Sequence, residues 1–404
     1  MRCSLLILNI LALVAGPCAF GQALPVAELT ATSTCCNYFP ELGYSVAISG
    51  STIAAAAPGA FINGLRQGAV YVYAKSATAP WASTTQSAIL LSGGVDSVGI
   101  SGDGSVIVAA GINVTIFVRP SIGWHGMIQP VATLHPGPQL ETVAINAKGD
   151  TIVAGAYNAG TPSAPQKGEA CVWVEPSGGW ANANGMRQTA TLTAFDGAAY
   201  DQFGWSVTIF ANTIVIGAPG ETGLTAINGA AYVYARPQSG SWRTTSHYAS
   251  KLTASDGMPN DGFGFSVSIG NGGSLIGVGA PASGGSGPGR AYVFAKTPKG
   301  GWPHAMTQSA ELTPTDETRG EFGWGLAVAG NVVLVGAPYS GGTYTFAEPV
   351  TGWADISLPK SMIANVPTGY FGLSNSIGGK SIAVGAPGTP VSGDEVGAIF
   401  IFTN

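Results

Sequence analysis

Short segments of alternating or uniformly apolar residues, separated by glycine-rich polar turns, recur along almost the whole chain. Residues 189–242 show the pattern most clearly, with the segments ATLTA, GWSVTI, TIVIGA and AAYVYA. In the second of these, Trp205, Val207 and Ile209 alternate with polar residues, as in a strand with one buried face, whereas TIVIGA is apolar on both faces. Because no window carries a sustained apolar helical stripe, we expect an all-β protein with almost no helix.

This pattern recurs as a repeat, and a repeat is a better guide to domain number than chain length. The units span residues 26–81, 88–124, 131–180, 189–242, 249–302, 309–353 and 356–404. A tryptophan recurs in them at a spacing of roughly 50 residues, which is typical of propeller blades: Trp81, Trp124, Trp180, Trp242, Trp302 and Trp353. We therefore predict a single domain over residues 26–404, a seven-bladed β-propeller of four-stranded antiparallel blades.

The two ends of the repeat region complement each other. In most units a segment of the LT type follows the tryptophan and completes the preceding blade, but nothing follows the last segment, AIFIF at 398–402. The segment VAELT at 26–30 precedes the first complete unit and has no other place in the pattern. We expect this N-terminal strand to close the ring, because closure removes two exposed sheet edges.

Composition agrees with strands and turns and excludes two classes of partner. The chain has 60 glycines and 26 prolines, and only 9% of its residues are charged. Its formal net charge is −5 and it has no basic run, so neither nucleic acid nor an anionic membrane surface is an expected partner.

Residues 1–22 have the pattern of a signal peptide. Arg2 is followed by an apolar core over 5–15, and Ala19-Phe20-Gly21 places small residues at a cleavage site before Gln22. The core is short for a membrane span, although an uncleaved anchor is the alternative. We expect a secreted or extracytoplasmic protein, monomeric and not inserted in a membrane after signal removal.

Three cysteines follow the signal segment. Cys35 and Cys36 are adjacent, and either a strained disulfide or two free thiols fit the sequence. With Cys171 they are too few for a disulfide framework, and without neighbouring histidines they are weak evidence for zinc.

A Phe-Gly pair and a later Gly-Ala-Pro recur in register and resemble the FG-GAP repeat of integrin α-chain propellers and many exported bacterial proteins. The four paired copies are Phe203-Gly204 with Gly217-Ala218-Pro219, Phe263-Gly264 with Gly279-Ala280-Pro281, Phe322-Gly323 with Gly336-Ala337-Pro338, and Phe371-Gly372 with Gly385-Ala386-Pro387. The first unit has the variant Leu42-Gly43 with Ala56-Ala57-Pro58, and units two and three keep only the strand pattern. The resemblance covers residues 26–404.

The resemblance implies a seven-bladed propeller with a binding or adhesion role. It would also imply calcium if acidic D-x-D-x-D-G loops joined the first two strands of a repeat, but the connections here are short hairpins with at most one Asp each. A calcium site needs several oxygen ligands, so we expect the integrin-type calcium sites to be absent and predict no cofactor.

Acidic residues recur five positions apart before the Phe-Gly pair. The pairs are Asp196 with Asp201, Asp256 with Asp261, and Asp316 with Glu321. They are weak candidates for a ring of carboxylates at one mouth of the propeller that binds a cation or polar ligand. We favour a structural role, in which each Asp accepts backbone N–H groups two residues on and fixes the loop that enters the inner strand.

Catalytic constellations are scarce, so we predict a non-catalytic protein. Binding would use the loops after Gly-Ala-Pro and the acidic loops, with an extracellular protein or glycan as partner. One alternative is a lectin with inter-blade pockets lined by residues such as Trp242 or Trp302, although we favour packing roles for these rings. A second alternative is a polysaccharide hydrolase with a pair of carboxylates in the channel.

Overall fold

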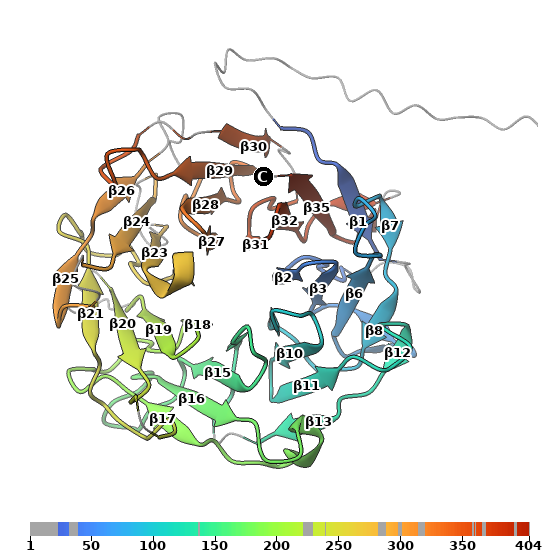
Figure 1. Ribbon diagram of the computed structural model, residues 1–404, viewed down its shortest axis with the longest axis horizontal. Coiled ribbons are helices and arrows are strands. Elements are labelled where there is room, and N and C mark those ends of the chain that lie inside the picture. Colours follow the sequence, from blue (N-terminus) through green and yellow to red (C-terminus); the bar gives the residue numbers. More distant parts are fainter. Residues whose placement is uncertain are drawn as a thin grey trace, which may run out of the picture.

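The computed structural model forms a ring of seven β-sheets around a central channel (Figure 1). It describes residues 23–31, 39–135, 138–220, 229–238, 240–281, 288–297, 301–313, 320–357, 359, 361–365, 369–391 and 394–403. Each sheet is one antiparallel blade whose strands lie in order from the channel outward, and we call them the inner, second, third and outer strand. The all-β, seven-bladed architecture predicted from the repeats is confirmed.

The strands of the first four blades are as follows, from inner to outer. Blade 1 has β2 (Val46–Ser49), β3 (Thr52–Ala57), β6 (Ala69–Ala74) and β8 (Ala88–Leu90). Blade 2 has β9 (Ser97–Ile100), β10 (Val106–Ala110), β11 (Val114–Val118) and β13 (Ala132–Leu134). Blade 3 has β14 (Thr142–Ile145), β15 (Thr151–Ala156), β16 (Glu169–Val174) and β17 (Ala190–Leu192). Blade 4 has β18 (Ser206–Phe210), β19 (Thr213–Ala218), β20 (Ala230–Ala235) and β21 (Ser250–Thr253).

The remaining blades follow the same order. Blade 5 has β22 (Ser266–Gly270), β23 (Leu275–Ala280), β24 (Arg290–Ala295) and β26 (Ala310–Leu312). Blade 6 has β27 (Leu326–Ala329), β28 (Val332–Ala337), β29 (Gly342–Ala347) and β30 (Ser361–Asn365). Blade 7 has β31 (Ser374–Gly378), β32 (Ser381–Ala386), β35 (Ala398–Thr403) and β1 (Ala27–Thr30). Two hairpins stand apart, β4 (Phe61–Ile62) with β5 (Leu65–Arg66) and β33 (Pro390–Val391) with β34 (Asp394–Glu395).

The hydrophobic core lies between neighbouring blades. The second strands are almost wholly buried, since both of their faces are covered by adjacent sheets. One cluster, for example, joins Val70 of blade 1 to Ile107 and Phe117 of blade 2. Two short 3-10 turns, Trp180–Asn182 and Asn271–Gly273, are the helical elements of the described residues. This packing explains why the segment TIVIGA and its equivalents are apolar on both faces.

The first strand of the chain completes the last blade. β1 pairs antiparallel with β35, with Ala27 opposite Ile401 and Leu29 opposite Ile399, so the N- and C-terminal strands lie side by side (Figure 1). Just before β1, Ala23 forms a bridge with Ile363 in the outer strand of blade 6. The N-terminal segment therefore joins two blades.

A further layer covers the outer strands, and the sequence pattern did not predict it. The segment between the third and outer strands of one blade runs parallel to the outer strand of the preceding blade. Three of these segments form short strands, β7 (Thr84–Thr85) on β1, β12 (Gly126–Ile128) on β8 and β25 (Ala305–Thr307) on β21. Bridges from Thr245 to Leu192 and from Ile356 to Leu312 place the equivalent segments of blades 4 and 6 in the same way. These contacts pair edges that would otherwise be open to other chains.

Candidate binding site at the channel mouth

The Phe-Gly pair forms a tight turn that leads into the inner strand. In blade 4 the Trp205 N–H donates to the Gln202 carbonyl at 3.0 Å, and Gly204 has φ 95°. A type II turn requires positive φ at its third position, which glycine adopts without strain. Phe203, at the second position, is buried against Tyr232 at a ring-centroid distance of 5.5 Å. The turn thus buries the ring of Phe203 and places Trp205 directly before the inner strand.

The same turn recurs in every blade that has an FG-type pair. The residue after the glycine donates its N–H to the residue before the pair: Tyr44 to Glu41, Phe265 to Gly262, Trp324 to Glu321, and Leu373 to Tyr370. The residues at the second position are all buried: Leu42, Phe263, Phe322 and Phe371.

The glycine of Gly-Ala-Pro contacts the FG turn of the next blade. A methyl group on Gly217 would overlap the carbonyl oxygen of Gly264 in blade 5. The same carbonyl accepts a hydrogen bond from the Ser206 hydroxyl at 2.8 Å. Equivalent overlaps occur for Gly279 with Gly323 and for Gly385 with Gly43, the latter across the ring closure. The FG-GAP residues therefore form the seams between blades.

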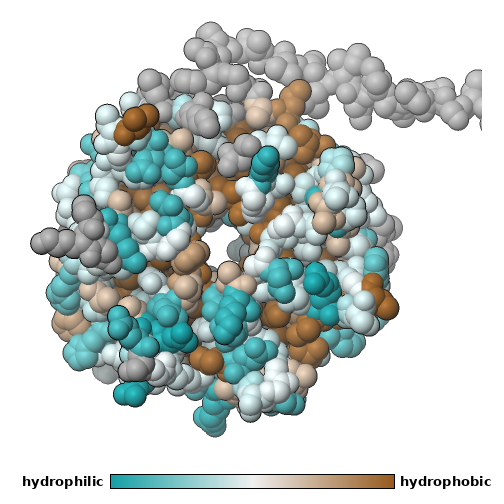
Figure 2. Space-filling model, viewed as in Figure 1, coloured by the Kyte–Doolittle hydropathy of each residue, from teal (hydrophilic) through white to brown (hydrophobic). Residues whose placement is uncertain are grey.

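Aromatic rings follow the channel at the end where these turns enter the inner strands, which we call the channel mouth. The channel is open at the centre of the ring (Figure 2). Successive rings contact one another, with centroid distances of 4.6 Å for Tyr157–Trp205, 5.2 Å for Trp205–Phe265, 4.5 Å for Phe265–Trp324, 6.0 Å for Trp324–Tyr339 and 5.5 Å for Tyr339–Tyr370. We call this set the aromatic arc. It extends from blade 3 to the turn that enters blade 7.

Part of the aromatic arc is open to solvent. Tyr339 is 58% exposed and Tyr370 is 49% exposed, while Trp205, Phe265 and Trp324 are half-buried. Tyr44, the equivalent residue of blade 1, is 42% exposed. Exposed aromatic rings gathered in one place are typical of binding surfaces.

Carboxylates lie at the mouth in blades 2 and 3, which lack the FG turn. Asp96 and Glu141 directly precede the inner strands there. Burial raises the pKa of Asp96, and the charges of Glu141 and Glu41 raise it further. Burial and a hydrogen bond with Glu141 raise the pKa of Tyr157 to about 12. The mouth therefore has an acidic side, formed by Glu41, Asp96 and Glu141, beside the aromatic arc.

Hydrogen bonds position one of these carboxylates. The Asn158 Nδ2 donates to Glu141 Oε1 at 3.0 Å, and the Gln166 Nε2 donates to Asn158 Oδ1 at 3.2 Å. Among the described residues, no basic side chain forms an ion pair with Glu41, Asp96 or Glu141. The acidic side thus keeps acceptor oxygens available to a ligand.

The first two acidic pairs predicted from the sequence lie in the loops that cross between blades. Asp201 Oδ2 accepts the Ala198 N–H at 2.6 Å, and Asp261 Oδ2 accepts the Met258 N–H at 2.7 Å. Each Asp thus fixes its turn through the N–H three residues before it, not two residues after it as the turn pattern implied.

Basic residues neutralise the other acids of these loops. Asp196 forms an ion pair with Lys251 at 2.6 Å, on the outer strand of blade 4. In blade 5 the cation is on the third strand instead. There Arg290 lies 2.8 Å from Glu311, 3.7 Å from Asp256 and 3.8 Å from Asp261. These contacts favour the structural interpretation.

The last predicted pair is described only in part. Glu321 begins the FG turn of blade 6, and burial raises its pKa. Asp316 lies outside the described residues. The described part of the chain contains no cluster of three or more His, Cys, Asp or Glu side chains arranged to hold a metal ion.

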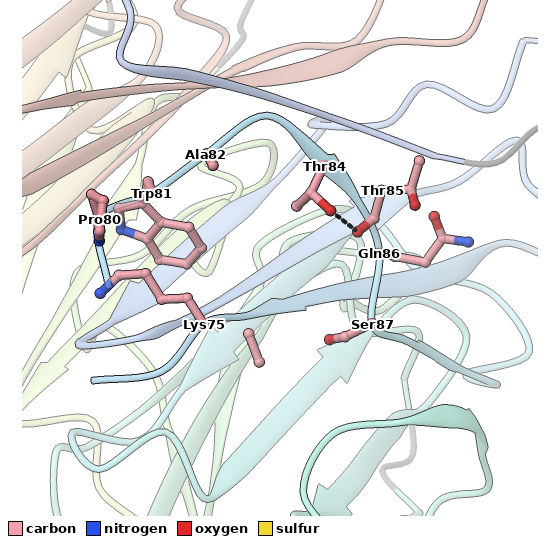
Figure 3. A pocket seen from close by; sticks show the side chains of 9 residues that line it. Lys75, Pro80, Trp81, Ala82, Thr84, Thr85, Gln86 and Ser87 are labelled. Carbon is pink, nitrogen blue, oxygen red and sulfur yellow. Dashed lines mark hydrogen bonds between the residues drawn. The ribbon is translucent and has the colours of Figure 1, made fainter. Parts of the chain in front are cut away.

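The repeated tryptophans pack at the other end of the blades. Trp124, Trp180 and Trp242 are 2–4% exposed, and the indole N–H of Trp180 donates to the Gly149 carbonyl at 2.7 Å. Trp81 is 8% exposed and lines a pocket of 330 Å³ beside Lys75, whose Nζ lies 5.4 Å from the ring centroid (Figure 3). These four rings are held in packing contacts, whereas Trp302 and Trp353 are half-buried.

Several predicted features fall outside the described residues. They are the signal segment 1–22, Cys35 and Cys36, and the loop segments 221–228 and 282–287 after Gly-Ala-Pro. Cys171 is a buried free thiol, and burial together with the nearby Glu169 raises its pKa to about 12. No helix among the described residues is long and apolar enough to cross a membrane.

The aromatic arc was not predicted from the sequence, although a signal was present. The residue after each FG-type pair is Tyr44, Trp205, Phe265, Trp324 or Leu373, so four of these five positions are aromatic. The arc also includes Tyr157 and Tyr339, which follow second strands. Only the three-dimensional structure shows that these residues lie together with Tyr370 at the channel mouth.

Comparisons with known proteins agree with the geometry of the turns. The family model of the FG-GAP repeat matches residues 186–234 and 248–294, which span blade 4 and much of blade 5. No curated protein matches the sequence. A solved structure titled "Structure of U3-55K" is similar in fold, with a TM-score of 0.53 and 12% identity over 89% of this chain and 95% of that chain. The chain thus forms a seven-bladed β-propeller that contains FG-GAP repeats.

Proposed function

We propose that this protein is an exported binding or adhesion module without catalytic activity, and that it engages its partner at the channel mouth. The observation that carries the proposal is the aromatic arc. Tyr339 and Tyr370 are about half exposed, and their rings continue a row that reaches Trp205 through Trp324. Aromatic residues contribute much of the energy at protein binding sites.

The scaffold supports this assignment because the FG turn forms without an aromatic residue at its fourth position. Leu373 occupies that position in blade 7, and the same turn forms there with a 3.1 Å hydrogen bond to Tyr370. The aromatic residues at this position in the other blades therefore need a reason beyond the turn itself. Contact with a partner supplies one.

Export is proposed from the sequence. Residues 1–22 have the charge, apolar core and small residues of a signal peptide. FG-GAP repeats are typical of extracellular proteins, which agrees with this location. Fractionation of producing cells, with N-terminal sequencing of the mature protein, would test it, and a cytoplasmic protein that keeps Met1 would contradict it.

Binding at the mouth is tested with labelled protein and whole cells or extracellular matrix. The variant Tyr339→Ala/Tyr370→Ala should lose most of its surface binding while its unfolding midpoint stays close to that of the wild type, because both rings are exposed. Phe195→Ala, which removes a 53% exposed ring from a crossover loop, is the matched control and should bind normally. Equal binding by all three proteins would contradict the proposal.

A further inference from the structure

The channel mouth combines two adjacent surfaces, the aromatic arc and the acidic side. The aromatic arc passes through five ring-to-ring contacts of 4.5–6.0 Å, and its rings are tilted by 48–80° to one another. The acidic side lies next to it, since Glu141 contacts Tyr157, the first ring of the arc. A ligand at the mouth meets apolar ring faces and acceptor oxygens together.

We infer that the channel mouth binds a neutral oligosaccharide, with successive sugar rings over the aromatic arc and sugar hydroxyls donating to Asp96, Glu141 and Glu41. This inference rests on the proposed function and names its ligand class. Sugar rings have apolar C–H faces that pack on aromatic rings, and their hydroxyls donate readily to carboxylates and amides.

The charges at the mouth favour a neutral sugar chain over an acidic one. The groups that act on Asp96 are Glu141 and Glu41, and those that act on Tyr44 are Asp96, Glu41 and Glu141. All of these groups are acidic. Sulfated or uronic sugars would therefore be repelled, whereas neutral hydroxyls find acceptors.

The length of the arc favours a chain over a single side chain. The rings run in succession from Tyr157 to Tyr370 across several blades. One cationic side chain of a protein partner would face only one or two rings and leave the others bare. An extended chain of sugar units, each with the same apolar face, covers the whole row.

The test is calorimetric titration with linear neutral hexasaccharides, such as cello-, chito- and laminari-hexaose. Wild-type protein should bind at least one of them with little dependence on salt, because the ligand has no charge. Tyr339→Ala and Tyr370→Ala should each weaken binding about tenfold, the loss expected for one stacking contact. Phe195→Ala, outside the arc, should bind as the wild type does.

Two conservative variants separate sugar from a basic peptide. Asp96→Asn and Glu141→Gln remove charge but keep an acceptor oxygen. Each should weaken sugar binding by about three- to tenfold without abolishing it, because a hydroxyl donates more strongly to a carboxylate than to a neutral amide. Binding of an oligolysine peptide that is salt-sensitive and lost in these variants, with no hexasaccharide bound, would overturn the inference and leave the proposed mouth function standing. Hexasaccharide binding that is unchanged in both tyrosine variants would also overturn it. If neither probe bound and cell binding were unaffected by the tyrosine variants, the proposed function would fail as well.

Discussion

The second strand has a glycine at the seam between blades 4 and 5 and an alanine at the seam between blades 2 and 3, a difference of one side-chain methyl group. At the first seam the second strand has Gly217, which packs against the FG carbonyl of Gly264. At the second, the equivalent residue is Ala110, which pairs with Ser97 as Gly217 pairs with Ser206. Blade 3 has no FG turn, so the methyl group of Ala110 meets no such carbonyl.

This difference shows that the two halves of the FG-GAP motif act across blades and not within one. Blade 1 has Ala56 in place of the glycine, and blade 2, which follows it, lacks the FG pair. Blade 3 lacks the FG pair itself but keeps Gly155, because the turn of blade 4 packs on it. The glycine of one blade is therefore required by the FG turn of the next.

The largest expected effect on stability comes from giving the seam between blades 4 and 5 the alanine that the seam between blades 2 and 3 has. Gly217→Ala should destabilise the protein by about 3 kcal/mol, because the new methyl group overlaps backbone that is fixed in the neighbouring blade. Urea unfolding followed by tryptophan fluorescence measures the change in the free energy of unfolding.

The reverse substitution is the control. Ala110→Gly should cost only about 1 kcal/mol, the usual penalty for glycine in a strand. If both variants lost the same free energy of unfolding, contact with the FG carbonyl would not be the reason for glycine at position 217.

The repeats predicted the fold well because strand periodicity, blade length and the placement of VAELT each have a direct structural cause. They did not predict the parallel segments such as β12 and β25, which are three-residue, largely exposed strands recognisable only from their neighbours. The acidic pairs were recognised, but the sequence does not show that Lys251 and Arg290 from other strands lie beside them. The aromatic arc was missed because its members come from three different places in the repeat.

A middle-sized effect is expected at Ser206, the serine that follows the turn of blade 4. At the blade 4–5 seam the Ser206 hydroxyl donates to the Gly264 carbonyl, whereas in blade 2 the Ser97 oxygen accepts the Val143 N–H at 3.1 Å. Ser206→Ala should cost about 1 kcal/mol, since it leaves a part-buried carbonyl without its donor.

The control for the serine is Ser274→Ala, which removes an exposed hydroxyl from a hairpin. It should change the free energy of unfolding by less than about 0.5 kcal/mol. A Ser206→Ala variant as stable as this control would show that the seam hydroxyl contributes nothing beyond a surface contact.

The smallest effect compares Asp96 at the mouth with Asp196 in a crossover loop, through the pH dependence of stability. Burial and the charges of Glu141 and Glu41 raise the pKa of Asp96. Burial also opposes ionisation of Asp196, but the hydrogen bond and charge of Lys251 outweigh it and lower the pKa of Asp196.

A raised folded-state pKa means that ionised Asp96 destabilises the fold, so this penalty is present near pH 7 and is relieved as pH falls through that pKa. A lowered pKa means that ionised Asp196 stabilises the fold above the unfolded value of about 3.9, and this contribution is lost as pH falls below it. At pH 7, Asp96→Asn should therefore raise stability and Asp196→Asn should lower it, each by less than about 1 kcal/mol because both sites are partly exposed. Urea unfolding at pH 7 and pH 3 measures both changes, which should shrink at the lower pH. If both variants shifted stability in the same direction at pH 7, Asp96 would have a stabilising partner as Asp196 does, and the acidic side would be less free to accept sugar hydroxyls.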